Sequence, residues 1–257
     1  MSRDLAPGEL MPRETSNAGT PLAGIELAIF DKDGTLIDFH FMWSDWVRAL
    51  ARGLEAASGR DLDGIVYPMM GVDEATGRVQ PHGALAATPM VRLRAELVAA
   101  IAEAGLEASE AERVVRAAWH SPDPVSLARP IADLHALFTS LRASGTRIAI
   151  ATSDDRDPTE RTLEHFGLTS LVDAVACADD GRPVKPFPDS VHWICQTIGV
   201  PEARTAVIGD SPADLQMGRS AGVGLVIGVL TGAGDAGSLA ALADLTLPSI
   251  AELLPPR

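Results

Sequence analysis

The sequence contains very few lysines and cysteines. Only two of its 21 basic residues are lysines, Lys32 and Lys185, and the other 19 are arginines. Because arginine supplies almost all of the positive charge, we expect each lysine to have a specific role. The two cysteines, Cys177 and Cys195, form no Cys-x-x-Cys pair and no Cys/His spacing typical of a zinc site. We expect both to be small buried residues of the core.

Long apolar runs and clusters of basic residues are also absent. No stretch reaches the ~20 apolar residues that a membrane span needs, and residues 1–23 lack the apolar segment of a signal peptide. The Pro, Gly, Ser and charged residues there predict a flexible leader and a cytoplasmic protein. The formal net charge of -14 disfavours binding to nucleic acid, which requires clustered Lys and Arg. We expect no nucleic-acid or membrane partner, and the sequence leaves the oligomeric state open.

Short apolar runs alternate with helical patterns over much of the chain. Strands are predicted at residues 25–30, 147–152, 174–177, 205–208 and 224–229. Helical patterns lie at about 131–145, 160–166, 190–198 and 213–221. Strands that alternate with helices predict an α/β fold with a doubly wound, mostly parallel, Rossmann-like sheet.

The region between the first two predicted strands has a different pattern. Its apolar residues recur at i, i+3, i+4 and i+7, as in Trp43, Trp46, Val47, Leu50 and Leu54 and again in Val91, Leu93, Leu97 and Ile101. Pro and Gly interrupt it at Pro68–Gly71 and Gly77–Gly83, where loops are expected. The predicted organisation is a leader at 1–23, an α/β core at 24–40 and 124–257, and an α-helical cap domain at 41–123.

The first predicted strand ends in two aspartates, Asp31 and Asp33, followed by Gly34 and Thr35. Two buried carboxylates this close repel each other, and burial raises their pKa values unless a cation neutralises them. Hard oxygen ligands favour Mg²⁺. The pair therefore predicts a magnesium site, although Asp and Gly also suit an ordinary turn.

Polar motifs follow the later strands as well. Thr152 and Ser153 follow the second strand, Lys185 lies in a loop bordered by prolines, and Asp210 and Asp214 follow the fourth strand. Because the carboxyl ends of parallel strands meet at one edge of a sheet, we expect all four motifs to lie close together. The alternatives are local, namely helix capping by the hydroxyl and carboxylate groups and a solvated loop lysine.

In this order the four motifs resemble those of the haloacid dehalogenase superfamily, in its phosphoglycolate phosphatase-like branch. The matching segments are Asp-Lys-Asp-Gly-Thr-Leu-Ile-Asp at 31–38, the strand-ending Thr152, Lys-Pro-Phe-Pro-Asp at 185–189, and Gly-Asp-Ser-Pro-Ala-Asp at 209–214. The helical insert resembles the cap domain of that family. The resemblance implies Mg²⁺-dependent hydrolysis of a small phosphorylated metabolite through an aspartyl-phosphate intermediate.

The resemblance also implies a role for each matching residue. Asp31 would be the nucleophile and Asp33 the general acid and base. Thr152 and Lys185 would contact the transferring phosphoryl group. The metal would be held by the carboxylates of Asp31 and Asp210 and by the backbone carbonyl of Asp33. The backbone amides of Gly34 and Thr35 would face the phosphate, and Ser153 would also bind it. Asp214 would support a bound water or Lys185.

Related activities can be weighed against these residues. Dehalogenases of the superfamily lack the second acidic residue, so Asp33 favours phosphate chemistry. Phosphonate-cleaving relatives use a cap lysine, and the predicted cap contains none. A phosphosugar mutase would share every core residue and stays open, as does a catalytically silent binding or signalling relative. A phospho-acceptor receiver module has similar groups on a similar sheet, but it is shorter and has no large insert.

Overall fold

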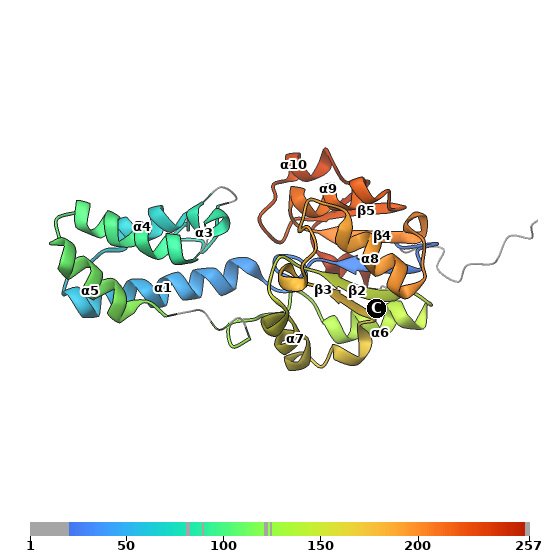
Figure 1. The fold of residues 1–257 in the computed structure, drawn as a ribbon, viewed down its shortest axis with the longest axis horizontal. Coiled ribbons are helices and arrows are strands. Elements are labelled where there is room, and N and C mark those ends of the chain that lie inside the picture. Colours follow the sequence, from blue (N-terminus) through green and yellow to red (C-terminus); the bar gives the residue numbers. More distant parts are fainter. Residues whose placement is uncertain (1–20, 81–82, 89, 121–122, 124, 255–257) are drawn as a thin grey trace, which may run out of the picture.

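A computed structural model describes residues 21–254 apart from 81–82, 89, 121–122 and 124, and it divides into a core and a helical lobe (Figure 1). The core contains a six-stranded sheet in the order β3-β2-β1-β4-β5-β6, in which every pair of neighbours is parallel. The strands are β1 (Leu27–Phe30), β2 (Arg147–Ala151), β3 (Ala174–Ala176), β4 (Thr205–Gly209), β5 (Leu225–Val229) and β6 (Leu245–Leu247). The strand order reverses between β1 and β4, and ligands of such sheets bind at this switch point.

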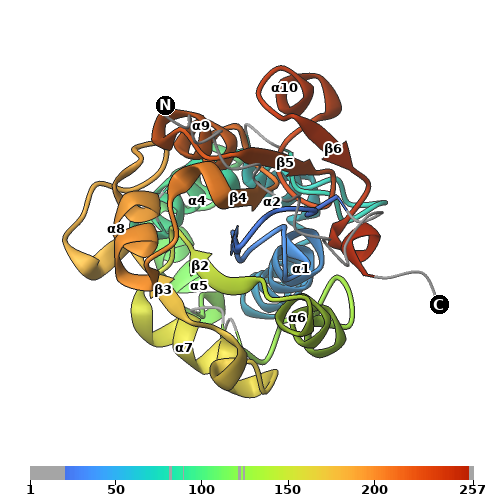
Figure 2. The same cartoon turned by 90° about the vertical axis from the view of Figure 1, so that its right-hand side faces the viewer.

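Helices cover both faces of the sheet (Figure 2). In β1, Ala28 and Phe30 pack on one face with α6 (Leu134–Ala143), whereas Leu27 and Ile29 pack on the other with α8 (Asp189–Ile198). Because successive side chains of a strand point to opposite faces, a strand covered on both sides is apolar throughout. The other core helices are α7 (Arg156–His165), α9 (Pro212–Ala221), α10 (Ala236–Ala240) and the 3₁₀ turns η1 (Thr169–Leu171), η2 (Ala178–Asp180), η3 (Glu202–Arg204) and η4 (Ile250–Leu253).

The helical lobe lies between β1 and α6 in the chain and has an apolar core of its own. Its helices are α1 (Phe39–Ser58), α2 (Asp63–Met70), α3 (Ala84–Ala87), α4 (Met90–Glu103) and α5 (Ala108–Ala118). Helix α1 begins where the Asp38 carboxylate accepts a hydrogen bond from the N–H of Phe41. We call this lobe the cap.

The predicted fold class, a doubly wound α/β core with an inserted helical cap, is confirmed. Two local predictions about the cap are wrong: Pro68 lies inside α2 rather than in a loop, and Val91 is 87% exposed rather than part of the apolar face. Residues 1–20 of the predicted leader lie outside the described residues, and Leu22 is already buried in the core. Both cysteines are buried and free. None of the helices in the described ranges is long and apolar enough to cross a membrane.

Candidate active site

Three carboxylates meet at the carboxyl ends of the two central strands. Asp31 follows β1, Asp210 follows β4, and Asp214 lies in the first turn of α9. All three are buried, and one oxygen of each lies within 4.8 Å of the others. The structure thus brings together groups that are far apart in the sequence.

Lys185 enters this acidic cluster from the loop between β3 and α8. Its ammonium forms ion pairs with Asp31 Oδ1 and with Asp214 Oδ1, the latter at 2.5 Å. Burial lowers the pKa of Lys185, but Asp214 and Asp31 outweigh this effect, so its pKa is raised and the ammonium stays charged. One ammonium cannot balance three carboxylates, and the cluster keeps an excess of negative charge.

This excess charge is reflected in the pKa values of the carboxylates. Burial raises the pKa of Asp31 well above its ordinary value despite the nearby ammonium of Lys185. Burial and the neighbouring Asp214 raise the pKa of Asp210 to about 6. A bound divalent cation would relieve this repulsion, and an all-oxygen site suits Mg²⁺. The cluster therefore fits the metal that the sequence predicts.

Asp210 is held in place by two neighbouring loops. Its Oδ1 accepts a hydrogen bond from Thr35 Oγ1 at 3.1 Å, and its Oδ2 accepts one from the N–H of Ala233 at 2.8 Å. A Cβ atom at Gly34, where φ is +85°, would lie 2.5 Å from Asp210 Oδ2, and one at Gly232 would lie 1.9 Å from it. Sequence reasoning missed the loop that contains Gly232 and Ala233. The Thr-Gly-Ala-Gly run after β5 was the available signal.

Asp214 contributes to the cluster by holding Lys185. Its Oδ2 accepts hydrogen bonds from the N–H of Ser211 at 3.0 Å and from Ser211 Oγ at 2.6 Å. Ser211 in turn caps α9, and Pro212 occupies the first turn. Because Lys185 and Ser211 each contact one oxygen, this arrangement favours the predicted supporting function of Asp214.

Asp33 does not join the acidic cluster. Both of its carboxylate oxygens contact the ammonium of Lys32, at 2.6 and 2.7 Å, and this ammonium also lies 2.9 Å from Asp154 Oδ2. Burial raises the pKa of the Asp33 carboxyl. Lys32 opposes this rise, Asp154 adds to it, and the pKa of Asp33 is raised overall. The scarcity of lysine pointed to Lys32 without indicating its function. Nothing in the sequence pattern pointed to Asp154, although two aspartates directly follow Ser153.

The predicted phosphate-binding residues have different surroundings. Thr152 is buried, and its Oγ1 accepts a hydrogen bond from the N–H of Asp154 at 3.1 Å, which leaves the hydroxyl able to donate. Ser153 is exposed. The N–H of Gly34 donates to the carbonyl of Ile37 at 2.7 Å, so this amide is used within its own loop rather than facing a phosphate.

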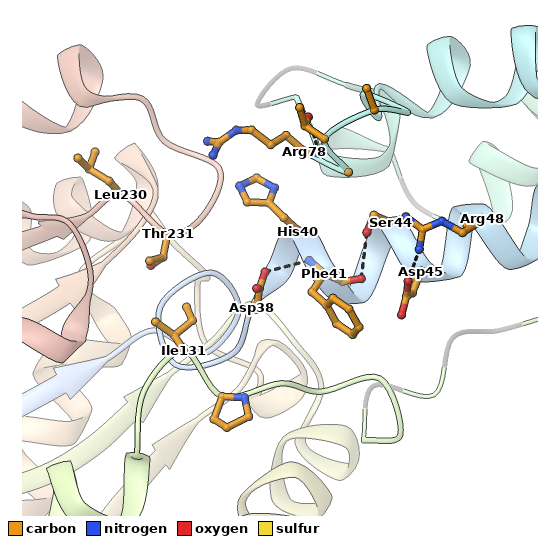
Figure 3. A pocket seen from close by; sticks show the side chains of 14 residues that line it. Asp38, His40, Phe41, Ser44, Asp45, Arg48, Arg78, Ile131, Leu230 and Thr231 are labelled. Carbon is orange, nitrogen blue, oxygen red and sulfur yellow. Dashed lines mark hydrogen bonds and ion pairs between the residues drawn. The ribbon is translucent and has the colours of Figure 1, made fainter.

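A cavity of about 620 Å³ lies between the cap and the core. His40 and Phe41 of α1, Arg78 of a cap loop and Thr231 of the core line part of it (Figure 3). His40 connects the two lobes, since its Nδ1 accepts from the N–H of Val79 and its Nε2 lies 3.1 Å from the carbonyl of Gly232. The cavity reaches the strand ends only at Leu230 and Thr231, which follow β5, and none of Asp31, Asp33, Thr152, Lys185, Asp210 and Asp214 lines it.

The fold and the acidic cluster together define an α/β protein with a helical cap and a buried cluster of aspartates at the switch point of its sheet. Residues 25–222 match the family described as hydrolase, haloacid dehalogenase-like hydrolase. The chain belongs to this family, and the predicted resemblance is confirmed.

Individual relatives are more distant. The chain is 30% identical to a phosphoglycolate phosphatase of Rhodospirillum rubrum over 43% of its own length and 46% of that protein, so it spans less than half of this relative. It is 29% identical to the tyrosine-protein kinase PtkA of Mycobacterium tuberculosis over 82% of its length and 64% of that protein. A crystal structure of a HAD-superfamily hydrolase from Geobacter sulfurreducens shares the fold, with a TM-score of 0.63, 19% identity and coverage of 94% of this chain and 100% of the other.

Proposed function

We propose that the protein is a Mg²⁺-dependent phosphatase that hydrolyses a small phosphomonoester through an aspartyl-phosphate at Asp31. The observation that carries this proposal is the cluster of Asp31, Asp210 and Asp214 around the ammonium of Lys185 at the switch point of the sheet. Membership of the hydrolase family and the similarity to a phosphoglycolate phosphatase support it.

In the first step, a carboxylate oxygen of Asp31 attacks phosphorus and forms a new P–O bond while the bond to the leaving alkoxide breaks. Asp33 transfers a proton to this alkoxide, which leaves as an alcohol. The raised pKa of Asp33 suits a group that must carry a proton near neutral pH. The ammonium of Lys185 offsets the negative charge of the phosphoryl oxygens, and the hydroxyl of Thr152 orients the phosphoryl group by donating a hydrogen bond to it.

In the second step, water attacks the phosphorus of the aspartyl-phosphate. Asp33, now a carboxylate, accepts a proton from the water, and the bond between phosphorus and Asp31 breaks. Inorganic phosphate leaves, and Asp31 regains its carboxylate while Asp33 regains its proton. The cycle therefore needs no reactant other than the phosphomonoester and water.

The carboxylates of Asp31 and Asp210, with the backbone carbonyl of Asp33, are the proposed ligands of Mg²⁺. When bound, the ion would supply positive charge beside the phosphoryl group. Asp214 is the proposed support for Lys185, because its Oδ1 forms an ion pair with that ammonium and its Oδ2 accepts from Ser211. The cavity between cap and core suits a small metabolite, and closure of a cap would exclude bulk water.

The test is phosphate release from a panel of small phosphomonoesters, with Mg²⁺ or EDTA, by the native protein and by Asp31→Asn. We expect release that requires Mg²⁺ and falls to background in Asp31→Asn. Asp157→Asn is the matched control, since the Asp157 side chain is 83% exposed on α7 and should keep full activity.

Two other results would contradict the proposal. Conversion of a phosphosugar into its isomer without phosphate release would identify a mutase. A folded, Mg²⁺-loaded protein that releases phosphate from no substrate would favour the silent binding relative.

A further inference from the structure

Lys32 is one of only two lysines in the chain, and the proposed reaction leaves it without a function. Its side chain is 2% exposed, so its ammonium is almost fully removed from water. A buried charge is costly unless it is paired and hydrogen-bonded. The partners of Lys32 should therefore indicate what it does.

The first partner of Lys32 is the proposed general acid and base, Asp33. The ammonium contacts both carboxylate oxygens, and among the described residues it is the only donor to them. The direction of the Asp33 carboxylate consequently depends on Lys32.

The second partner, Asp154, anchors Lys32 to the loop after β2. Its Oδ2 lies 2.9 Å from the ammonium, its N–H donates to Thr152 Oγ1 at 3.1 Å, and its carbonyl accepts from the N–H of Ala178 at 2.9 Å. Asp154 is thus fixed by its own backbone. It fixes Lys32 relative to Thr152, the proposed phosphoryl contact.

We propose that Lys32, anchored by Asp154, is a positioning residue that directs the Asp33 carboxylate toward the oxygen of the leaving group. This inference rests on the proposed function, since it takes Asp33 as the general acid. Direct contact between Lys32 and substrate phosphate is disfavoured, because the ammonium is buried and both of its partners are carboxylates.

The dependence of the rate on the leaving group separates positioning from a general structural effect. An alkoxide must receive a proton as it leaves, whereas 4-nitrophenolate is a weak base and leaves without one. The ratio kcat/KM reports transition-state stabilisation relative to free enzyme and substrate. Loss of a well-placed Asp33 should therefore lower kcat/KM for an alkyl phosphate far more than for 4-nitrophenyl phosphate.

The first experiment compares the native protein with Lys32→Met on glycerol phosphate and on 4-nitrophenyl phosphate. Misplacement of a reacting group by 1 Å can cost a factor of about 100, and we expect a loss of that order with glycerol phosphate only. Lys32→Arg keeps the charge and should restore part of the loss. Arg142→Met, which removes an ion pair with Asp173 near the opposite end of β2, is the matched control and should affect neither substrate.

The second experiment tests whether Lys32 acts through Asp33. If it does, Lys32→Met should produce no further loss in an Asp33→Asn background, because the residue that it directs is already absent. Asp154→Asn should give a smaller loss with the same preference between the two substrates. Because the side chain of Asp154 is 41% exposed, this variant also provides the test if Lys32→Met does not fold.

The outcomes distinguish this inference from the proposed function. An active native enzyme in which Lys32→Met and Asp154→Asn slow both substrates equally would overturn the positioning inference alone. The positioning inference alone would also be overturned if Lys32→Met lowered kcat/KM by the same factor in the Asp33→Asn background as in the native protein. A native enzyme that is inert toward both substrates would overturn the proposed function and, with it, this inference.

Discussion

Among single residues, Asp210 most directly links the stability of the protein to its proposed metal. Burial and the neighbouring Asp214 raise its pKa from 3.8 to about 6. A shift of this size corresponds to about 3 kcal/mol between the charged and neutral forms. At neutral pH the folded protein without metal therefore contains a carboxylate that would be better solvated in the unfolded chain.

The first prediction concerns Asp210→Asn. Because the folded pKa lies above the unfolded one, the stability that Asp210 contributes is fully present below 3.8 and is lost as pH rises through about 6. Without Mg²⁺, the native protein should lose up to about 3 kcal/mol more than the variant over this window, since the losses from Asp31 and Asp33, whose pKa values are also raised, occur in both proteins. Urea unfolding across this pH range measures the difference.

Mg²⁺ should change this comparison above pH 6. A ligand that binds only the folded state stabilises it, so Mg²⁺ should raise the unfolding free energy of the native protein and have little effect on Asp210→Asn. Equal stabilisation of both proteins by Mg²⁺ would show that Asp210 is not a ligand.

At the scale of secondary structure, burial explains which elements the sequence could predict. The strands β1, β2, β4 and β5 are central and covered on both faces, so their apolar runs are unbroken. The missed strand β6, Leu245–Leu247, is an edge strand in which all three residues are only half-buried. The edge strand β3, Ala174–Ala176, is equally short and was predicted, but two of its residues are buried.

The strand pattern also explains which contacts of the site could be predicted. The sequence could place Asp31 near Asp210, because each follows a strand and the carboxyl ends of parallel strands share one edge. The contact of Lys32 with Asp154 could not be predicted in this way. It depends on how two loops bend beyond their strands, and the strand pattern carries no information on that.

The second prediction concerns the start of α9. Ser211→Ala removes the hydroxyl that caps this helix, and Asp133→Ala removes the matched cap of α6, where the Asp133 carboxylate accepts from the N–H of Ala136. Each change should lower the unfolding free energy by about 1 kcal/mol. Only Ser211→Ala should also lower kcat, because Ser211 holds Asp214 and Asp214 holds Lys185. Steady-state kinetics with urea unfolding would check this, and an equal fall in kcat in both variants would disprove the connection.

At the scale of the whole molecule, the relative position of cap and core depends on contacts at their junction. His40 bonds to a cap loop and to the core carbonyl of Gly232, and the guanidinium of Arg129 lies 3.3 Å from the ring centroid of Phe41. The cavity between the lobes is lined by residues of both. The position of the cap should therefore govern how well the substrate is bound rather than the chemistry at Asp31.

The third prediction concerns His40→Phe. Because Nδ1 accepts from the N–H of Val79, His40 must be neutral, with its proton on Nε2 donated to Gly232. Burial and nearby Arg78 lower its pKa below 6.5, while Gly232 and Asp38 oppose this. The hydrogen bond from Val79 is thus complete above pH 6.5 and is lost as pH falls through the lowered pKa, whereas Nε2 keeps its proton and its contact with Gly232. Above that pH, loss of about 1 kcal/mol of hydrogen bonding should raise KM about fivefold, with kcat little changed.

Acidification should narrow the KM difference without abolishing it, because protonation of His40 removes the acceptor for Val79 while Nε2–H still donates to the carbonyl of Gly232. The difference in KM between native protein and variant, measured as a function of pH, should therefore be larger on the neutral side than in acid. His135→Phe, on an exposed position of α6, is the matched control and should follow the native curve. A KM difference that persists unchanged in acid would mean that the hydrogen bond from Val79 to His40 does not contribute to KM.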